Sequence, residues 1–446
     1  MIIYIETLGC PKNLTDSEGA AGILKKAGHQ LTEDVSKADV ILVNTCGFIQ
    51  DAKEESIDRI LDMAEERQRG ARLIVSGCLS QRYGTTLQKE FPEVDVFLGV
   101  NDYARLPEIL DHLDLEIGKL YHSQDSGSYP EFESRHSLGP SYTAYLKIAE
   151  GCDNRCAYCS IPGIRGAYRS RSMDKILEEA AKLVSEGCKE IILIAQDVTA
   201  YGIDIYGSYR LPDLLTELCR LNDLVWLRLM YCYEDRISDE LIQVIAENKK
   251  ICRYIDIPIQ HASNTILRAM KRRSTYESIV DTITRLRTSI PDIRIRTTLI
   301  TGFPGETEED FLQLEAFVQK MKFDRLGVFA YSKEEGTTAA TMKPQIRTAT
   351  KQRRKERIME LQREISLEHN QSLIGSKIQV LIEAEEEGTF IGRSPYDAPE
   401  IDNSVIVSSP KKLLPGEFVE VEIIDGFDYD LSAVVLPRSS EQRRQS

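Results

Sequence analysis

The chain has no apolar run long enough to cross a membrane in its 446 residues. Its first residues, MIIYIETLGCPK, carry no basic leader and reach Glu6 at once, unlike a secretory signal peptide. Ten cysteines in a chain of this length are too sparse for a disulfide scaffold. We therefore expect a cytoplasmic protein of several domains without membrane contact.

Positive charge is also in short supply. Lys and Arg total 56 against 71 Asp and Glu, which gives a formal net charge of −15. Such a chain is not expected to hold nucleic acid over its whole surface, and a basic partner would be attracted to it.

The cysteines are unevenly placed, and their placement is informative. Cys10, Cys46 and Cys78 are isolated but each occurs in a similar local context, whereas residues 152–159 hold three cysteines close together. The other four share no context, and a lone cysteine is most often a small buried hydrophobic residue. We interpret these four as core residues: Cys188, Cys219, Cys232 and Cys252.

Strand and helix patterns alternate over residues 1–118, which predicts a mostly parallel sheet covered by helices. The expected strands are IIYIETLG, ADVILVNTCG, RLIVSGC and VDVFLGV, and DSEGAAGILKKAG is expected to be a helix with an acidic first turn. Cys10, Cys46 and Cys78 each follow the end of a strand. The carboxyl ends of parallel strands share one edge, where ligands bind, so these cysteines are expected to converge.

The rest of the chain divides by pattern into further parts. Residues 119–142 are rich in Ser, Gly, Pro and charge and are expected to be a linker. Residues 143–344 contain six strand–helix units, typical of an incomplete (β/α)6 barrel with its chemistry at the C-terminal strand ends. Residues 345–374 predict one long polar helix, and residues 438–446 a tail. Residues 375–437, with the runs KIQVLIEAE, SVIVSS, FVEVEIID and SAVVL, predict a small antiparallel β-barrel.

The clustered Cys152, Cys156 and Cys159 follow the first strand of the predicted barrel. Structural zinc takes four ligands, usually in two Cys-x2-Cys pairs, and no second pair lies nearby, which disfavours zinc. A cubane iron–sulfur cluster held by three thiolates leaves one iron open to a small molecule. We predict such a cluster; the plain alternative is three cysteines packed by chance in a loop.

The stretch GCDNRCAYCSIPGIRG resembles the signature of the radical S-adenosylmethionine (SAM) superfamily. The resemblance implies a 4Fe–4S cluster whose open iron binds SAM, and a low-potential electron donor that reduces the cluster. It also implies SAM contacts, namely Tyr158 near the adenine, Gln196 near the methionine end, and Gly302, Pro304 and Gly305 in the segment ITGFPGETEEDF.

The stretches LGCPKNLTDSE, VNTCGFIQDAKEES and VSGCLSQRY are similar to the N-terminal domain of the radical SAM methylthiotransferases. This resemblance implies that Cys10, Cys46 and Cys78 hold a second 4Fe–4S cluster and that residues 375–437 form a TRAM-like barrel. It implies conversion of a C–H bond to C–SCH3, with one SAM giving the methyl group and another the radical. No catalytic residue is assigned beyond the cluster ligands.

Two observations bear on the substrate. LGCPKN and NTCGFIQDAKEESID resemble the branch of the family that modifies the β-carbon of an aspartate in small-subunit ribosomal protein twelve. Residues 375–437 hold four basic and thirteen acidic residues, a balance of −9, which should repel RNA and attract a basic ribosomal protein. The basic segment KQRRKER, residues 351–357, and the basic tail are compatible with a contact to ribosomal RNA.

Two other functions stay open at this point: a tRNA adenosine methylthiotransferase, and a non-catalytic iron–sulfur or zinc protein that binds RNA or the ribosome. We take the chain to be a monomer.

Overall fold

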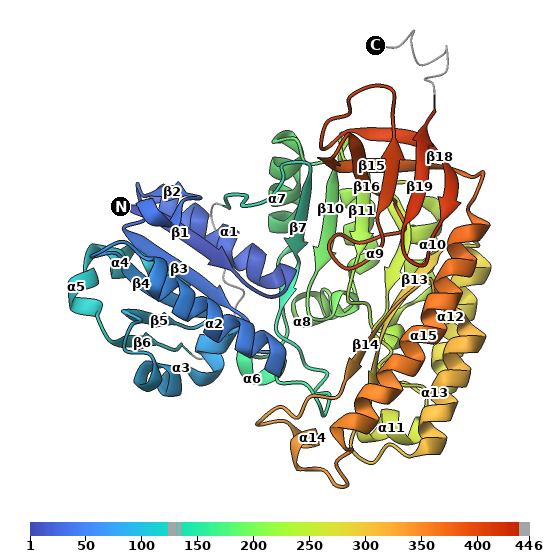
Figure 1. Cartoon of the computed structure of the whole chain (residues 1–446), viewed down its shortest axis with the longest axis horizontal. Helices are drawn as coiled ribbons and strands as arrows, with labels where there is room; N and C mark the ends of the chain where they lie inside the picture. Colours follow the sequence, from blue (N-terminus) through green and yellow to red (C-terminus); the bar gives the residue numbers. More distant parts are fainter. Residues whose placement is uncertain (124–130, 132–134, 437–446) are drawn as a thin grey trace.

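The computed structural model describes residues 1–123, 131 and 135–436, so residues 124–130 and 132–134 of the expected linker and the expected tail, 438–446, lie outside it. Figure 1 shows three bodies: an N-terminal sheet with its helices, a central sheet with helices on its outer face, and a small C-terminal barrel. No helix in this part of the chain is long and apolar enough to span a membrane.

The N-terminal body is a six-stranded parallel sheet in the order β2-β1-β3-β4-β5-β6. Its strands are β1 (Ile2–Thr7), β2 (Gln30–Thr32), β3 (Val40–Thr45), β4 (Arg72–Gly77), β5 (Val96–Leu98) and β6 (Lys119–Tyr121). Its principal helices are α1 (Pro11–Lys26), α2 (Gln50–Glu66) and α3 (Cys78–Glu90). The predicted parallel sheet is confirmed, with hydrophobic clusters on both faces of β3 and β4.

Two local expectations for this body were wrong. The first helix begins at Pro11, five residues before the expected start, because proline is well suited to the first helical position. Its first turn therefore has no acidic residue, and Cys10 is its N-cap. Lys119–Tyr121, expected in the linker, pairs with Val96–Leu98 as the edge strand β6.

The central body contains the six predicted strands as an open parallel sheet, each beside its neighbour in the sequence. They are β7 (Thr143–Lys147), β10 (Glu190–Ile194), β11 (Trp226–Leu229), β12 (Ile251–Asp256), β13 (Arg294–Thr301) and β14 (Arg325–Ala330). The longer helices between them are α7 (Met173–Ser185), α9 (Leu211–Leu218), α10 (Asp239–Glu247), α12 (Tyr276–Ser289) and α13 (Glu308–Met321). The incomplete barrel is thus confirmed.

The C-terminal part is a long helix followed by a closed five-stranded barrel. Helix α15 (Thr348–Ser372) runs along the outside of the central sheet (Figure 1). The barrel strands are β15 (Lys377–Glu386), β16 (Thr389–Arg393), β17 (Val405–Ser408), β18 (Phe418–Gly426) and β19 (Leu431–Val435). The expectation of a wholly antiparallel barrel was wrong at one place, since β17 and β19 pair in parallel.

Buried ion pairs join the small barrel to the N-terminal ends of the central strands. Glu190, the first residue of β10, accepts hydrogen bonds from Arg228 Nε at 3.0 Å and from Arg393 Nη2 of β16 at 2.5 Å. Trp226, the first residue of β11, packs edge-to-face on Phe418 with ring centroids 4.8 Å apart. The small barrel therefore closes the strand edge opposite to the edge at which ligands bind in parallel sheets.

Arg393→Met is expected to lower the free energy of unfolding by about 3–5 kcal/mol, because it leaves the buried Glu190 carboxylate short of a partner. Urea unfolding followed by the fluorescence of Trp226, the only tryptophan of the chain, measures the loss. Lys412→Met is the control, since the Lys412–Glu385 pair is exposed and is worth about 0–1 kcal/mol. Equal losses in both variants would contradict the prediction.

The same ion pair makes the docking of the small barrel sensitive to acid. Burial alone raises the pKa of Glu190, but Arg393 and Arg228 outweigh burial and hold the pKa at about 2. The stabilisation is complete above the ordinary glutamate pKa of 4.5 and is lost as the pH falls from there towards 2.

Candidate active site between the N-terminal sheet and the central barrel

The first cysteine trio lies at the carboxyl edge of three adjacent strands. Cys10 caps α1 after β1, Cys46 directly follows β3, and Cys78 opens α3 after β4. Burial and, to a lesser extent, the Cys78 and Cys10 thiols nearby raise the pKa of Cys46 to about 12. The convergence that the strand pattern predicted for these three residues is therefore observed.

Glycines beside the cysteines let their loops pack closely. Gly9 has a φ of +88°, and a Cβ there would lie only 2.6 Å from Cys46 Cβ. A Cβ at Gly47 would lie 2.8 Å from the backbone of Leu79, in the next loop. Larger residues at these positions would push the three cysteine loops apart.

The second trio lies in the loop between β8 (Ala149–Glu150) and α6 (Ile161–Arg165), at the carboxyl edge of the central sheet. The Asn154 side-chain amide lies 3.5 Å from Cys152 Sγ, and the Tyr233 hydroxyl lies 3.5 Å from Cys156 Sγ. Burial raises the pKa of Cys159 to about 12, with the other two thiols of the trio adding to the effect.

Within the described residues, no three His, Cys, Asp or Glu side chains are placed to hold a single metal ion. The case for each cysteine site therefore rests on the convergence of its loops and on the chemistry of its thiols. Three thiolates with no fourth cysteine nearby are a donor set suited to an iron–sulfur cluster with one open iron.

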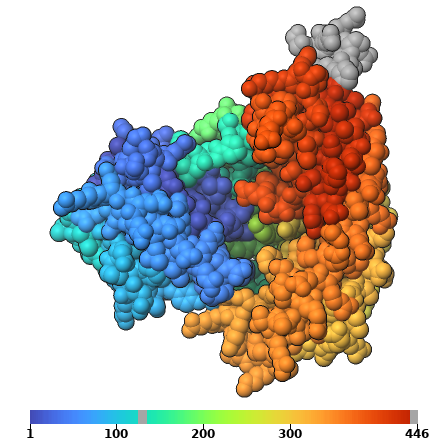
Figure 2. Space-filling view, viewed as in Figure 1, coloured from blue at the N-terminus to red at the C-terminus, as the bar shows by residue number. Residues whose placement is uncertain are grey.

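The elements that carry the two trios meet at the interface between the N-terminal and central bodies. On one side, Arg165 of α6 reaches Cys78, with Nη2 at 3.3 Å from Sγ. On the other side, Arg82 of α3 and Lys53 of α2 both bind Glu334, at 3.0 and 2.9 Å, in the segment that follows β14. Figure 2 shows a hollow between the blue N-terminal body and the orange C-terminal segments.

The residues predicted to contact SAM lie in two places near the second trio, one around Tyr158 and one after β10. Tyr158 packs in a hydrophobic cluster with Ile300 and Phe303, beside the segment that holds Gly302, Pro304 and Gly305. Gln196 follows β10, and its Nε2 donates to Glu150 Oε1 at 2.6 Å. Gln196 Oε1 is buried and has no hydrogen-bond partner among the described residues, so it offers an acceptor to a ligand.

Gly302, one of the predicted SAM contacts, is closely approached by another part of the chain. With a φ of +72°, Gly302 makes room for Lys351 of α15, whose Cγ would lie 2.3 Å from an added Cβ. No heavy atom of the described residues outside its own neighbourhood lies within 4 Å of a Cβ built at Gly305. Of these two glycines, therefore, only Gly305 has open space beside it.

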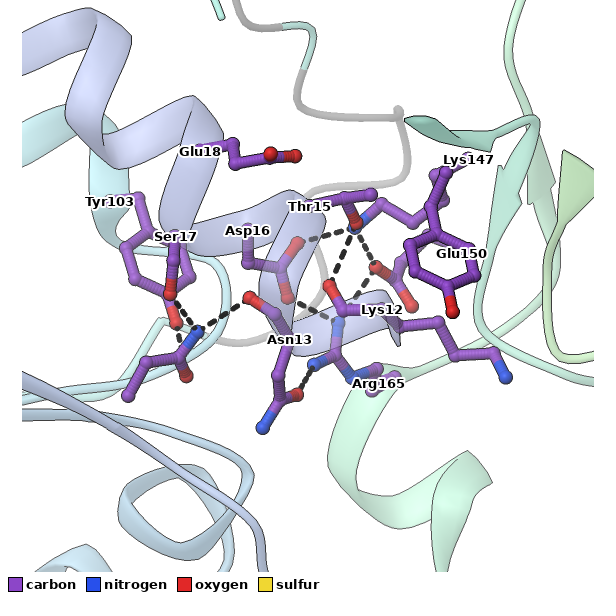
Figure 3. A network of polar contacts seen from close by, with 12 residues as sticks. Lys12, Asn13, Thr15, Asp16, Ser17, Glu18, Tyr103, Lys147, Glu150 and Arg165 are labelled. Carbon is purple, nitrogen blue, oxygen red and sulfur yellow. Dashed lines mark hydrogen bonds and ion pairs between the residues drawn. The ribbon is translucent and has the colours of Figure 1, made fainter. Parts of the chain in front are cut away.

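Sequence reasoning missed a buried polar network between the trios (Figure 3). The Asn13 side-chain amide donates to the Leu8 and Thr45 carbonyls at 2.9 and 3.0 Å and so links the loops of Cys10 and Cys46. Asp16 accepts from both Arg165 and Lys147 of the central body. The sequence offered one indication of this network, the group of polar residues in PKNLTDSE. They lie buried on α1 because the central body covers them.

The four remaining cysteines lie where a core role places them. Cys188, Cys232 and Cys252 are buried in hydrophobic clusters, and Cys219 is half-buried against one of them.

Comparison with known protein families finds three matches along the chain. The uncharacterized protein family UPF0004 matches residues 2–99, the radical SAM superfamily matches residues 146–318, and the TRAM domain matches residues 374–436.

Several curated relatives carry the same name, ribosomal protein uS12 methylthiotransferase RimO. The relative from Desulforamulus reducens is 52% identical over 437 residues, covering 96% of this chain and 98% of the relative. The relative from Lachnoclostridium phytofermentans is 50% identical over 436 residues, covering 97% and 99%.

Two solved structures share the fold. The radical SAM methyltransferase TsrM from Kitasatospora setae, with cobalamin and a 4Fe–4S cluster bound, aligns with a TM-score of 0.55 at 14% identity and covers 74% of each chain. The cobalamin-dependent SAM radical enzyme OxsB aligns with a TM-score of 0.51 at 12% identity and covers 80% of this chain and 56% of that one. At these identities the likeness concerns the fold alone.

Proposed function

Because the chain belongs to the ribosomal protein uS12 methylthiotransferase family of radical SAM enzymes, we propose that it places a methylthio group on the β-carbon of a uS12 aspartate. The observation that carries the proposal is the presence of two separate cysteine trios, one in each of two bodies that share an interface. One trio suits radical generation, and the other suits delivery of sulfur to the same substrate carbon.

The proposal also names the residues that would hold the cofactors. Cys152, Cys156 and Cys159 would hold one 4Fe–4S cluster and Cys10, Cys46 and Cys78 a second. The unpartnered Gln196 oxygen suits the ammonium group of SAM. When bound, the clusters and SAM supply a radical that removes hydrogen from an unactivated carbon, a sulfur atom, and a methyl group.

The chain's own contribution is position and the exclusion of water. Cys46, Cys78, Cys152 and Cys156 are each at most 8% exposed, so a cofactor held there is shielded from solvent on the protein side. The interface contacts of Arg165, and of Glu334 with Arg82 and Lys53, fix the spacing of the two trios.

The acidic TRAM barrel supports a basic protein as substrate, after one correction. Asp397 and Asp402 are buried in ion pairs with Arg325 and Arg296 of the central body and do not face a partner. Glu385, Glu386 and Glu387, at the turn between β15 and β16, are exposed. We propose this turn as part of the surface that attracts uS12.

Most of the basic segment 351–357 is used within the chain. Lys351 is buried and donates to the Tyr331 carbonyl, Arg354 pairs with Glu306, and Arg357 pairs with Glu315. Any contact with ribosomal RNA by this segment is therefore left to Arg353 and Lys355. A low-potential electron donor, a cytoplasmic location and a monomeric state complete the proposal.

Offering uS12 and tRNA separately with SAM, a reductant and a sulfur source tests the proposed substrate. We expect mass spectrometry to find one methylthio group on an aspartate of uS12 and none on tRNA. The control is the same mixture without reductant, which should leave uS12 unmodified. Modification of tRNA alone would refute the proposal.

A further inference from the structure

Arg165 belongs to the polar network of Figure 3 and also contacts a cysteine of the N-terminal trio. It is the last residue of α6, six residues after Cys159, and only 2% of it is exposed. Its Nη2 lies 2.7 Å from Asn13 Oδ1 and 3.3 Å from Cys78 Sγ, both in the N-terminal body. A residue of the helix that follows the second trio thus donates to a thiol of the first trio.

Arg165 also binds two buried carboxylates. Its Nη1 binds Asp16 Oδ2 at 2.7 Å and Glu150 Oε2 at 2.9 Å, and Lys147 binds the same two carboxylates. Arg165 and Lys147 thus share Asp16 and Glu150 as ion-pair partners. The carboxylates occupy Nη1, which leaves Nη2 for the amide oxygen and the sulfur.

The use of one nitrogen for carboxylates and of the other for sulfur explains why the residue is an arginine. A guanidinium presents donors in a planar fork, so it can serve carboxylates on one nitrogen and sulfur on another. A lysine places all its donors on one nitrogen, as Lys147 shows beside it, where that nitrogen binds the two carboxylates.

We propose that Arg165 is a positioning residue for the N-terminal cluster, holding the Cys78 ligand through a charged hydrogen bond to its sulfur. The inference rests on the proposed function. Hydrogen bonds to ligand sulfur and nearby positive charge stabilise the reduced, more negative state of an iron–sulfur cluster. Arg165 therefore makes the reduction potential of that cluster less negative.

The competing explanation is that Arg165 only ties two bodies together. A purely structural tie would change stability but not the potential of the cluster. The reduction potential of the N-terminal cluster, measured alone, is therefore the readout that separates the two roles.

The experiment starts from a parent in which Cys152, Cys156 and Cys159 are all alanine, so that only the N-terminal site can hold a cluster. Arg165→Lys and Arg165→Gln are added to this parent and reconstituted with iron and sulfide. Iron content under a competing chelator, and a redox titration followed by electron paramagnetic resonance, are compared with the parent.

The matched control is Arg171→Lys in the same parent. Arg171 is also a buried arginine, but it pairs with Glu131 and Glu179 and donates to the Lys147 carbonyl. It matches the loss of a buried guanidinium without the loss of a contact to sulfur.

We expect Arg165→Lys to keep the circular dichroism of the parent, because Asp16 and Glu150 keep a cation. Its cluster should have a more negative potential and bind iron about 10–100-fold more weakly, as happens when a group hydrogen-bonded to a metal ligand is changed. Arg165→Gln should show a larger shift, and Arg171→Lys none.

Arg165→Lys with the parent's potential and iron retention would overturn the inference, as would loss of the native fold in Arg165→Lys when Arg171→Lys folds. If the parent itself held no iron, the proposed function would fail along with the inference. If the parent holds a cluster and Arg165→Lys leaves its potential and iron retention unchanged, the inference fails while the proposed function stands.

Discussion

Cys156→Ala is expected to abolish reductive cleavage of SAM. The variant removes one of only three thiolates in a loop that offers no other cysteine, so the cluster loses a ligand that no neighbour replaces. Changes to groups that only hydrogen-bond a metal ligand already lower metal affinity or activity about 10–100-fold. Loss of a ligand itself should therefore lower SAM cleavage by more than about 100-fold. Chromatography of 5′-deoxyadenosine, formed with SAM and dithionite, measures it.

Cys188→Ala is the matched control for this prediction. Cys188 is 2% exposed and lies just before β10, at the strand edge opposite to the cysteine loops. It should cleave SAM at close to the wild-type rate. Cleavage by Cys156→Ala at the rate of Cys188→Ala would show that the loop is not the radical site.

Cys46→Ala is expected to keep most SAM cleavage but to lose methylthiolation of uS12. The second trio is intact in this variant, so SAM cleavage should fall by less than about tenfold, whereas methylthiolation of uS12 should be lost. Both products are measured in one reaction, 5′-deoxyadenosine by chromatography and modified uS12 by mass spectrometry.

Circular dichroism is the required control, because Cys46 packs against Gly9 and a local collapse would disturb the whole interface. Equal loss of both activities in a variant with native circular dichroism would argue against two independent sites.

The arrangement of the cysteines was predictable because it depends on short-range patterns. Strand patterns place Cys10, Cys46 and Cys78 after β1, β3 and β4, and parallel strands end at one edge. The register of the sheet then brings the three loops together without further information. The start of α1 was misjudged because the acidic residues after Cys10 looked like a first turn, whereas they face the central body.

The contact between the trios was not predictable in this way. Arg165 and Cys78 are 87 residues apart, and no strand pattern relates α6 to α3. A polar helix face such as that of α1 is normally taken as solvated, and only the docking of a second body shows that it is buried. The same holds for Asp397, Asp402 and Arg354, whose charges counted toward surface patches until the structure placed them in buried pairs.

The central claim is that one chain holds two separate iron–sulfur sites. Analysis of iron and acid-labile sulfide tests it in the wild type and in two variants, each with one cysteine trio changed to alanine. We predict about eight irons in the wild type and about four in each variant, as two 4Fe–4S clusters require. Loss of all iron from a folded variant, or one zinc and no iron in the wild type, would contradict the claim.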